Sequence, residues 1–160
     1  MIHIRYTHCM RRTDRQLPFD AAMNVLGRGS HGVLSMAVEE NRVYAIPLNY
    51  AVEGMTIYFH GALEGTKTEI ARKHPQGMLV CVTEEEVLAE KFTTQYESAI
   101  AEGHVRIVED EDERIRGFRA LIKRYAPERI EQGDRYIEHM KDKTLLFALD
   151  IEQLQGKKRQ

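Results

Sequence analysis

One stretch near the middle of the chain, residues 43–71, constrains the fold more than any other. Two runs of alternating large and small side chains, residues 43–50 and 55–60, flank a Glu-Gly turn at residues 53–54. Alternation with a period of two predicts β-strands, and a short connection that contains glycine predicts a hairpin. A Gly-Thr-Lys sequence at residues 65–67 then begins a run typical of a helix. We therefore expect a β-hairpin that leads through a glycine-containing loop into a helix.

The two faces of the strand at residues 43–50 differ in bulk. One face carries Tyr44, Ile46, Leu48 and Tyr50, and the other carries Val43, Ala45, Pro47 and Asn49. Proline has no N–H to donate to a neighbouring strand, so Pro47 marks an edge strand, a bulge or a place where the sheet opens. This strand is therefore expected where the sheet ends or is interrupted.

The same alternation predicts several further strands. They lie at residues 32–38, 77–83, 97–109 and 144–151. The long run at 97–109 contains Gly103, a candidate for a bend. The first three strands of the chain, with tight turns between them, suggest an antiparallel meander. About six strands with few helices predict a mainly β fold, a closed or nearly closed antiparallel barrel with peripheral helices, rather than a doubly wound sheet.

Helices are expected at the edges of this barrel. The first is short, with start signals at residues 17–20 and with Gly27 and Gly29 as natural stops, and the other two lie at residues 66–73 and 110–125. Asp110 with Glu113 resembles a capping box at the start of the third, and Ala126-Pro127 ends it. The other segments are an aperiodic run at 87–96, a loop at 128–143 with a weak helix near 134–140, an arginine-rich extended arm at 1–16 and a solvated polar tail at 156–160.

The composition is that of one soluble globular domain spanning residues 1–160. Of the 160 residues, 42% are hydrophobic and 30% are charged, which argues against a disordered chain. The formal net charge of −2 argues against broad nucleic-acid binding. No run reaches the length of a membrane span, and the first residues lack the apolar stretch of a signal peptide, so we expect a cytoplasmic protein. The two cysteines, Cys9 and Cys81, are expected to be free thiols.

The loop at residues 60–67, with the sequence H-G-A-L-E-G-T-K, is a candidate phosphate site. It is not a Walker A loop, because only three residues separate its glycines and Thr66 stands before the lysine. Backbone N–H groups at a helix start, the Thr66 hydroxyl and the Lys67 ammonium could still hold a phosphomonoester. The alternative is an ordinary helix start with a surface lysine. His60 is likewise either a catalytic group or a histidine at the barrel rim, and no histidine shows metal-ligand spacing.

Several motifs in order and spacing resemble those of the pyridoxamine 5'-phosphate oxidase-like, FMN-binding split-barrel family. The resemblance covers residues 10–156 and is greatest to the branch of 5-nitroimidazole-resistance (Nim-type) proteins. The motifs are L-G-R-G at 26–29 with G-V-L at 32–34, Y-A-I-P-L-N-Y at 44–50, I-Y-F-H-G-A at 57–62 with Gly65 and Lys67, and E-K-F-T-T-x-Y-x-S at 90–98.

The resemblance implies a six-stranded antiparallel split β-barrel that forms a homodimer, with FMN bound in two clefts at the subunit interface. The implied cofactor-binding residues are Ala45, Ile46, Pro47, Leu48, Asn49, His60, Gly61, Ala62, Gly65, Thr66, Lys67, Tyr96 and Ser98. Lys67 would hold the phosphate, and His60 would stand near the flavin and a bound substrate. The small face of the strand at 43–50 gives a physical reason for this placement, because a flat ring needs room and backbone donors.

The sequence therefore favours an FMN-dependent oxidoreductase that reduces small aromatic or nitro-aromatic compounds, with His60 as the candidate catalytic residue and no metal or nucleic-acid partner. One alternative is a pyridoxamine-phosphate oxidase, although the chain lacks the arginine-rich substrate signature of those enzymes. The other is a non-catalytic flavin- or haem-binding module.

Overall fold

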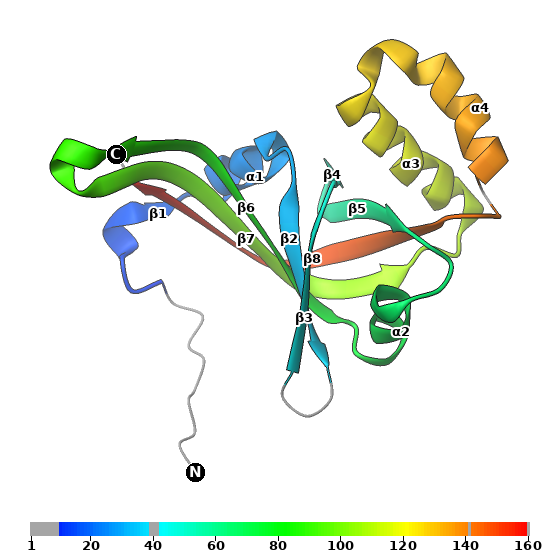
Figure 1. Cartoon of the computed structure of the whole chain (residues 1–160), viewed down its shortest axis with the longest axis horizontal. Coiled ribbons are helices and arrows are strands. Elements are labelled where there is room, and N and C mark those ends of the chain that lie inside the picture. The colour runs from blue at the N-terminus through cyan, green and yellow to red at the C-terminus, as the bar shows by residue number, and fades with distance from the viewer. Residues whose placement is uncertain (1–9, 39–41, 141, 160) are drawn as a thin grey trace.

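The structure is a computed structural model that describes residues 10–38, 42–140 and 142–159. Its centre is one antiparallel sheet of eight strands flanked by helices (Figure 1). The strands are β1 (Gln16–Leu17), β2 (Gly32–Val38), β3 (Arg42–Leu48), β4 (Ala51–Glu53), β5 (Thr56–Gly61), β6 (Gln76–Leu88), β7 (Thr93–Ile107) and β8 (Leu145–Arg159). The α-helices are α1 (Phe19–Arg28), α2 (Thr66–Lys73), α3 (Glu111–Tyr125) and α4 (Ile130–Met140). Short 3-10 helices are η1 (Thr13–Arg15), η3 (Ala89–Lys91) and η4 (Pro127–Arg129).

The sheet rolls into a split barrel because its two end strands are consecutive in the chain. The strand order is β3-β2-β6-β7-β8-β5-β4, and β1 pairs with β8 at one end of that strand. Leu48 ends β3 and Ala51 begins β4, so the opposite edges of the sheet are at most about 11 Å apart there. The two edges share no ladder of hydrogen bonds, and this is where the barrel is split. The predicted class is confirmed: six strands are long, and β1 and β4 are short additions.

Pro47 lies on an edge strand, as its missing N–H predicts, because β2 is the one neighbour of β3 among the described strands. The predicted meander is wrong. β5 pairs with β4 and β8 rather than with β3, since the strand expected at 43–50 stops at Leu48. The chain leaves the sheet at Tyr50, whose fully buried hydroxyl donates to the Leu26 carbonyl oxygen over 2.7 Å. The hairpin turn at residues 53–54 is present, with Gly54 in the left-handed region at φ 57°.

Four segments are more ordered than the sequence predicts. The aperiodic residues 87–96 contain the end of β6, η3 and the start of β7, which together form a hairpin. The weak helix extends over the whole of α4. The expected arm includes η1 and β1 in its described part, while residues 1–9 lie outside the described residues. The expected solvated tail continues β8 to Arg159 and pairs with β7.

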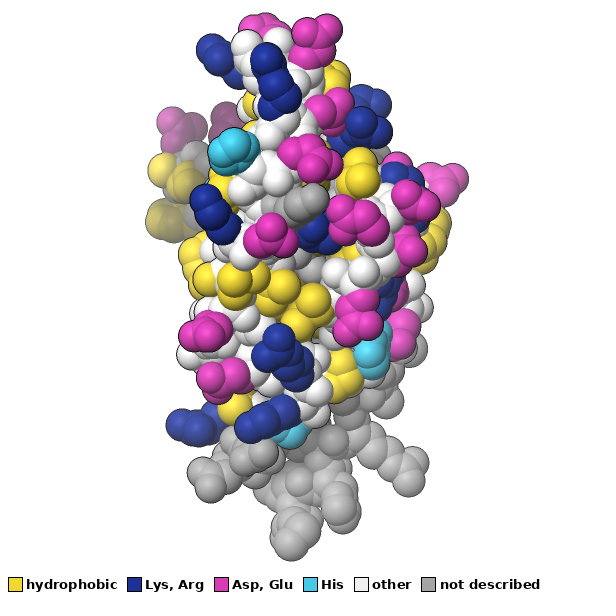
Figure 2. Space-filling model, turned by 90° about the vertical axis from the view of Figure 1, so that its right-hand side faces the viewer, with side chains coloured by type: hydrophobic (Ala, Val, Ile, Leu, Met, Phe, Trp, Pro, Cys, Tyr) yellow, Lys and Arg dark blue, Asp and Glu magenta, His cyan; other side chains and the backbone are white. Residues whose placement is uncertain are grey.

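Two clusters of buried side chains hold the layers together. The larger fills the barrel and includes Leu34, Phe59 and Phe147. The smaller lies between α3 and the outer face of β5 and β8, with Tyr58 and Leu146 among its members. Figure 1 shows α3 and α4 together at one end of the sheet, with the β6–β7 hairpin at the opposite end. The face that bears α2, α3 and α4 mixes both signs of charge rather than presenting one sign (Figure 2).

The start of α3 shows how local signals and tertiary contacts compete. Asp110 caps the helix, accepting from the Glu113 backbone N–H over 2.7 Å as the capping box predicts. The Glu113 carboxylate does not complete the box, because it binds the Arg106 guanidinium of β7. The register shift between Glu102 and Gly103 in β7 confirms the predicted bend.

Candidate functional site

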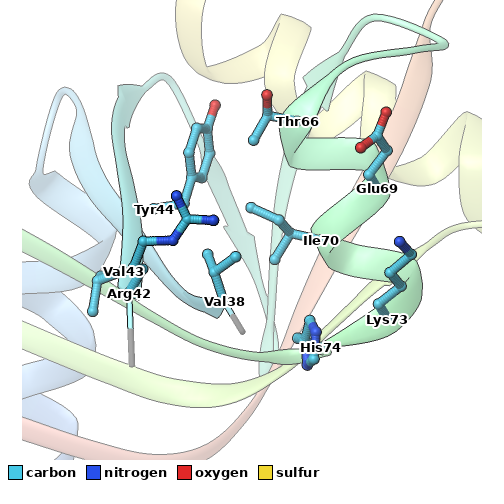
Figure 3. Close-up of a pocket in the computed structure, with 9 residues that line it drawn as sticks. All are labelled: Val38, Arg42, Val43, Tyr44, Thr66, Glu69, Ile70, Lys73 and His74. Atoms are coloured by element: carbon cyan, nitrogen blue, oxygen red, sulfur yellow. The ribbon is translucent and has the colours of Figure 1, made fainter. Parts of the chain in front are cut away.

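A cleft of about 370 Å³ lies between the edge strand β3 and helix α2 (Figure 3). Its lining residues are Val38, Arg42, Val43, Tyr44, Thr66, Glu69, Ile70, Lys73 and His74. In the close-up, the Tyr44 hydroxyl lies near Thr66 at one end, while Val38 and Ile70 form an apolar floor. Arg42 extends across the cleft from β3, and Lys73 stands on the α2 side. The cleft therefore combines an apolar surface with two cations, two hydroxyls, the Glu69 carboxylate and the His74 imidazole.

The side chains of Arg42 and Lys73 have no ion pair with a carboxylate in the described part of the chain. Both are exposed. Sequence reasoning did not identify either residue as part of the site. Lys73 was detectable in principle, because Thr66, Ile70 and Lys73 are spaced to share one helix face. Nothing in the sequence indicated that Arg42 would face that helix.

The start of α2 leaves backbone donors available beside this cleft. Gly65 precedes the helix at φ 126°, a region that favours glycine. Counted from the start of the helix, Glu69 is the first residue whose backbone N–H donates to a carbonyl oxygen four residues earlier, that of Gly65. The N–H groups of residues 66–68 therefore lack helical partners, as at any helix start. These donors, the Thr66 hydroxyl and the Arg42 guanidinium suit a phosphate group.

The Lys67 side chain leaves α2 on a different side from Thr66. Its Nζ donates to the His60 carbonyl oxygen over 2.9 Å and lies 4.9 Å from the centre of the Phe147 ring. It is not among the residues that line the cleft. Burial lowers the pKa of the Lys67 ammonium. Thr66 and Lys67, both predicted to bind phosphate, are therefore adjacent in the chain, but of the two only Thr66 faces the cleft.

His60 and Gly61 end β5, and Ala62 follows in the loop to α2. The His60 imidazole is exposed at the rim of the barrel and does not line the β3–α2 cleft. Strand alternation places it on the same face of β5 as Tyr58, toward α3. Partial burial and then the Lys67 charge lower the pKa of His60.

The residues predicted on β3 divide between its two faces. Ile46 and Leu48 are half-buried against the barrel core, whereas Ala45, Pro47 and Asn49 are exposed. Across the ladder, Ala45 faces Ser35 and Pro47 faces Val33 on β2. The outer surface of these two strands is consequently shallow and built from small side chains.

Tyr96 and Ser98 lie at the other end of the molecule from α2. They occupy the first part of β7, opposite Arg159 and Lys157 of β8. The end of α2 meets β7 at Val105, whose N–H donates to the Pro75 carbonyl oxygen. Nine residues of strand separate Tyr96 from Val105, about 30 Å at the usual rise. Within one chain, Tyr96 and Ser98 thus do not share the β3–α2 cleft.

The described residues contain no group of three or more His, Cys, Asp and Glu side chains arranged to hold a metal ion. Among these same residues, no helix combines the length and apolarity needed to span a membrane.

Comparisons with known proteins relate the chain to one family. The sequence profile of the pyridoxamine 5'-phosphate oxidase family matches residues 19–158. A search of curated protein sequences found no match. A structure from Bacteroides thetaiotaomicron assigned to 5-nitroimidazole antibiotic resistance is similar, with 17% identity, coverage of 89% of this chain and 85% of the other, and a TM-score of 0.73.

Two further solved structures share the fold. The flavocytochrome Anf3 of Azotobacter vinelandii is 18% identical, with coverage of 96% of this chain and 73% of the other and a TM-score of 0.77. An FAD-binding protein of Mesorhizobium loti is 18% identical, with coverage of 91% and 98% and a TM-score of 0.66. At these identities the similarity establishes the fold but does not identify a ligand.

Proposed function

Because this chain belongs to the pyridoxamine 5'-phosphate oxidase family, we propose that it is a flavoprotein that binds FMN and reduces small aromatic or nitro-aromatic compounds. The observation that carries this proposal is the β3–α2 cleft, where Arg42 extends from β3 toward α2 and Thr66 lies at the start of that helix. Arg42, the Thr66 hydroxyl and the backbone N–H groups without helical partners match the dianionic phosphate that distinguishes FMN from riboflavin, while Lys73 adds positive charge at the other end of the helix. Lys67 adds a third positive charge from behind the loop.

If the cleft holds the phosphate, the flat ring system of the cofactor needs an adjacent flat surface. The exposed side chains of Ala45 and Pro47 leave such a surface along β3, and Asn49 can hydrogen-bond at its end. Ile46 and Leu48 would contribute through their backbone, since their side chains pack inward. Gly61 and Ala62 would approach the cofactor from the end of β5 without bulky side chains.

We further propose that the active form is a homodimer with two symmetric flavin sites. Exposed valines on β2, β3 and β6 support a second copy on this face: Val33 is 41%, Val43 69% and Val82 52% exposed. A second copy would also bring Tyr96 and Ser98 to a cleft that they cannot reach within their own chain. The flavin site would then combine residues of both chains.

When bound, FMN supplies the electron transfer, and the protein supplies binding and orientation. His60, at the rim of the barrel, is the residue proposed to hydrogen-bond the aromatic acceptor. A small aromatic compound would stack on the face of the flavin that points away from the small residues of β3.

The phosphate assignment is tested by comparing FMN with riboflavin in fluorescence-quenching titrations. Replacing Arg42 with alanine removes a charge-assisted hydrogen bond and should weaken FMN binding about tenfold or more. Riboflavin affinity should be unchanged, because riboflavin lacks the phosphate. Arg119→Ala, an exposed arginine on α3, is the matched control. Equal losses for both flavins, or no loss for either, would contradict the assignment.

The catalytic part of the proposal needs a turnover assay with a reduced nicotinamide donor and a nitroimidazole. His60→Ala should retain flavin but lower acceptor turnover. Retained flavin with full turnover would remove His60 from the site.

A haem-binding or purely storage role is the second candidate, favoured by the likeness to a flavocytochrome. Absorbance of the purified protein separates the two, since oxidised flavin and haem have different visible spectra. Pyridoxamine-phosphate oxidation is the remaining enzymatic alternative, and the same assay with that substrate tests it.

A further inference from the structure

Three neighbouring residues contact the ammonium group of Lys67. Its ammonium donates to the His60 carbonyl oxygen and lies 4.9 Å and 5.4 Å from the ring centres of Phe147 and Phe59. The two rings are parallel within 1° and stacked at 5.4 Å, so they present adjoining π-faces to the same cation. The half-buried side chain thus joins the start of α2 to the ends of β5 and β8.

Gly61 makes room for this arrangement. A Cβ atom at that position would lie 2.5 Å from Lys67 Nζ and 2.7 Å from its Cε. It would also approach the Phe147 ring to 3.1 Å. Any other residue at Gly61 would therefore push the ammonium away from the His60 carbonyl.

We propose that Lys67 is a positioning residue for His60: its ammonium, held by the His60 carbonyl oxygen and the two phenyl rings, fixes the end of β5 and places a positive charge next to this residue. Lys67 was expected to act only on a phosphate, and its observed contacts give it a second role on the other side of the loop. The consequence of this second role for the reduction of an acceptor rests on the proposed function. The effect on His60 itself can be measured without any flavin.

Lys67 is the charged group that acts on His60 among the described residues, and the neighbouring elements also carry other groups. Across the ladder it faces Leu146 of β8, which is apolar. On α3, Arg114 donates to the Thr144 carbonyl oxygen and pairs with Glu111. The loop toward α2 also contains Glu64, which is exposed.

Partial burial, followed by the positive charge of Lys67, lowers the pKa of His60. A residue whose pKa lies below 6.5 is mostly uncharged at pH 7. His60 would then meet an acceptor as a neutral hydrogen-bonding group and not as an imidazolium. The acceptor's protons would have to come from another source, such as solvent.

The test is an NMR titration of His60 in the ligand-free chain, with the signal assigned by its loss in His60→Gln. In Lys67→Met the midpoint should move to higher pH, because the positive charge is gone. In Lys67→Arg it should stay near the wild-type value, because the charge is kept. Gly61→Ala should raise the midpoint without changing any ionisable residue, since the ammonium is displaced.

Lys73→Met is the matched control, because it removes the same charge from the cleft side of the same helix. Its His60 midpoint should equal that of the wild type. An unchanged midpoint in Lys67→Met would overturn the proposal, and so would an equal shift in Lys73→Met. Should Gly61→Ala not fold, the comparison of Lys67→Met with Lys67→Arg decides the question. These outcomes do not depend on flavin affinity, so failure here is distinct from failure of the proposed function.

Discussion

Replacing Arg106 with methionine is expected to lower the free energy of unfolding by about 2 kcal/mol at neutral pH. This value lies between the small contribution of an exposed ion pair and the larger cost of breaking a buried one. The Arg106 guanidinium, on β7, binds two carboxylates at once. It donates to Glu113 over 2.6 and 2.9 Å and to Asp150 over 2.6 and 3.2 Å. The Tyr58 hydroxyl also donates to Glu113, and burial, followed by that hydrogen bond, raises the pKa of Tyr58 to about 12. Methionine would leave two neighbouring carboxylates without their cation.

The magnitude is reduced because the network is only partly buried. The side chains of Arg106, Glu113 and Asp150 are 34%, 16% and 41% exposed, so solvent screens part of the interaction. A loss of about 2 kcal/mol corresponds to a roughly thirtyfold change in the unfolding equilibrium constant. Urea denaturation followed by circular dichroism measures it. Arg119→Met removes an ion pair with Asp134 that joins one arginine to a single carboxylate at the surface, and it should leave the midpoint close to that of the wild type.

The loss should also depend on pH. Hydrogen bonds from Arg106 lower the pKa values of Glu113 and Asp150 in the folded chain. Their contribution is therefore fully present above the unfolded pKa values, near 4, and is lost as the pH falls through the lower folded values. The difference between wild type and Arg106→Met should shrink below pH 4. A difference that is absent at pH 7, or that grows on acidification, would refute this reasoning.

Two further substitutions test the fold. Tyr50→Phe removes the hydroxyl that donates to the buried Leu26 carbonyl and should cost about 1–2 kcal/mol in urea denaturation; an unchanged midpoint would mean that this hydrogen bond adds nothing. Gly103→Ala would place a Cβ 1.9 Å from the Asp150 carbonyl oxygen and should prevent normal pairing of β7 with β8, seen as a large fall in thermal midpoint. Gly27→Ala meets no atom within 4 Å and is the control, so similar falls in both variants would count against the described register.

The sequence predicted the class of fold and the separate elements better than their extents. The C-terminal segment shows why. Its polar residues 156–160 resemble a solvated tail, yet β8 continues because Lys158 pairs with the buried Glu97, which Arg28 of α1 also binds. Gly156 packs closely on Ala22 of α1. Such contacts join segments far apart in the chain, and no local pattern reveals them.

The candidate site was predictable to a similar degree. The glycine-preceded helix start and Thr66 could be located from local spacing, and the structure places them beside a cleft. The opposite wall of the cleft could not be located in this way, because Arg42 comes to face α2 only when the sheet rolls up. Local spacing also could not show that Lys67 points toward the barrel end. The placement of Tyr96 at the far end of β7 is what makes a two-chain site the natural proposal.

The most direct test of the proposed two-chain flavin site is native mass spectrometry of the protein after incubation with FMN. We expect a species of two chains that carries two FMN molecules, and far weaker uptake of riboflavin under the same conditions. A chain that stays free of FMN, or one that binds riboflavin equally well, would contradict the placement of a flavin phosphate between β3 and α2.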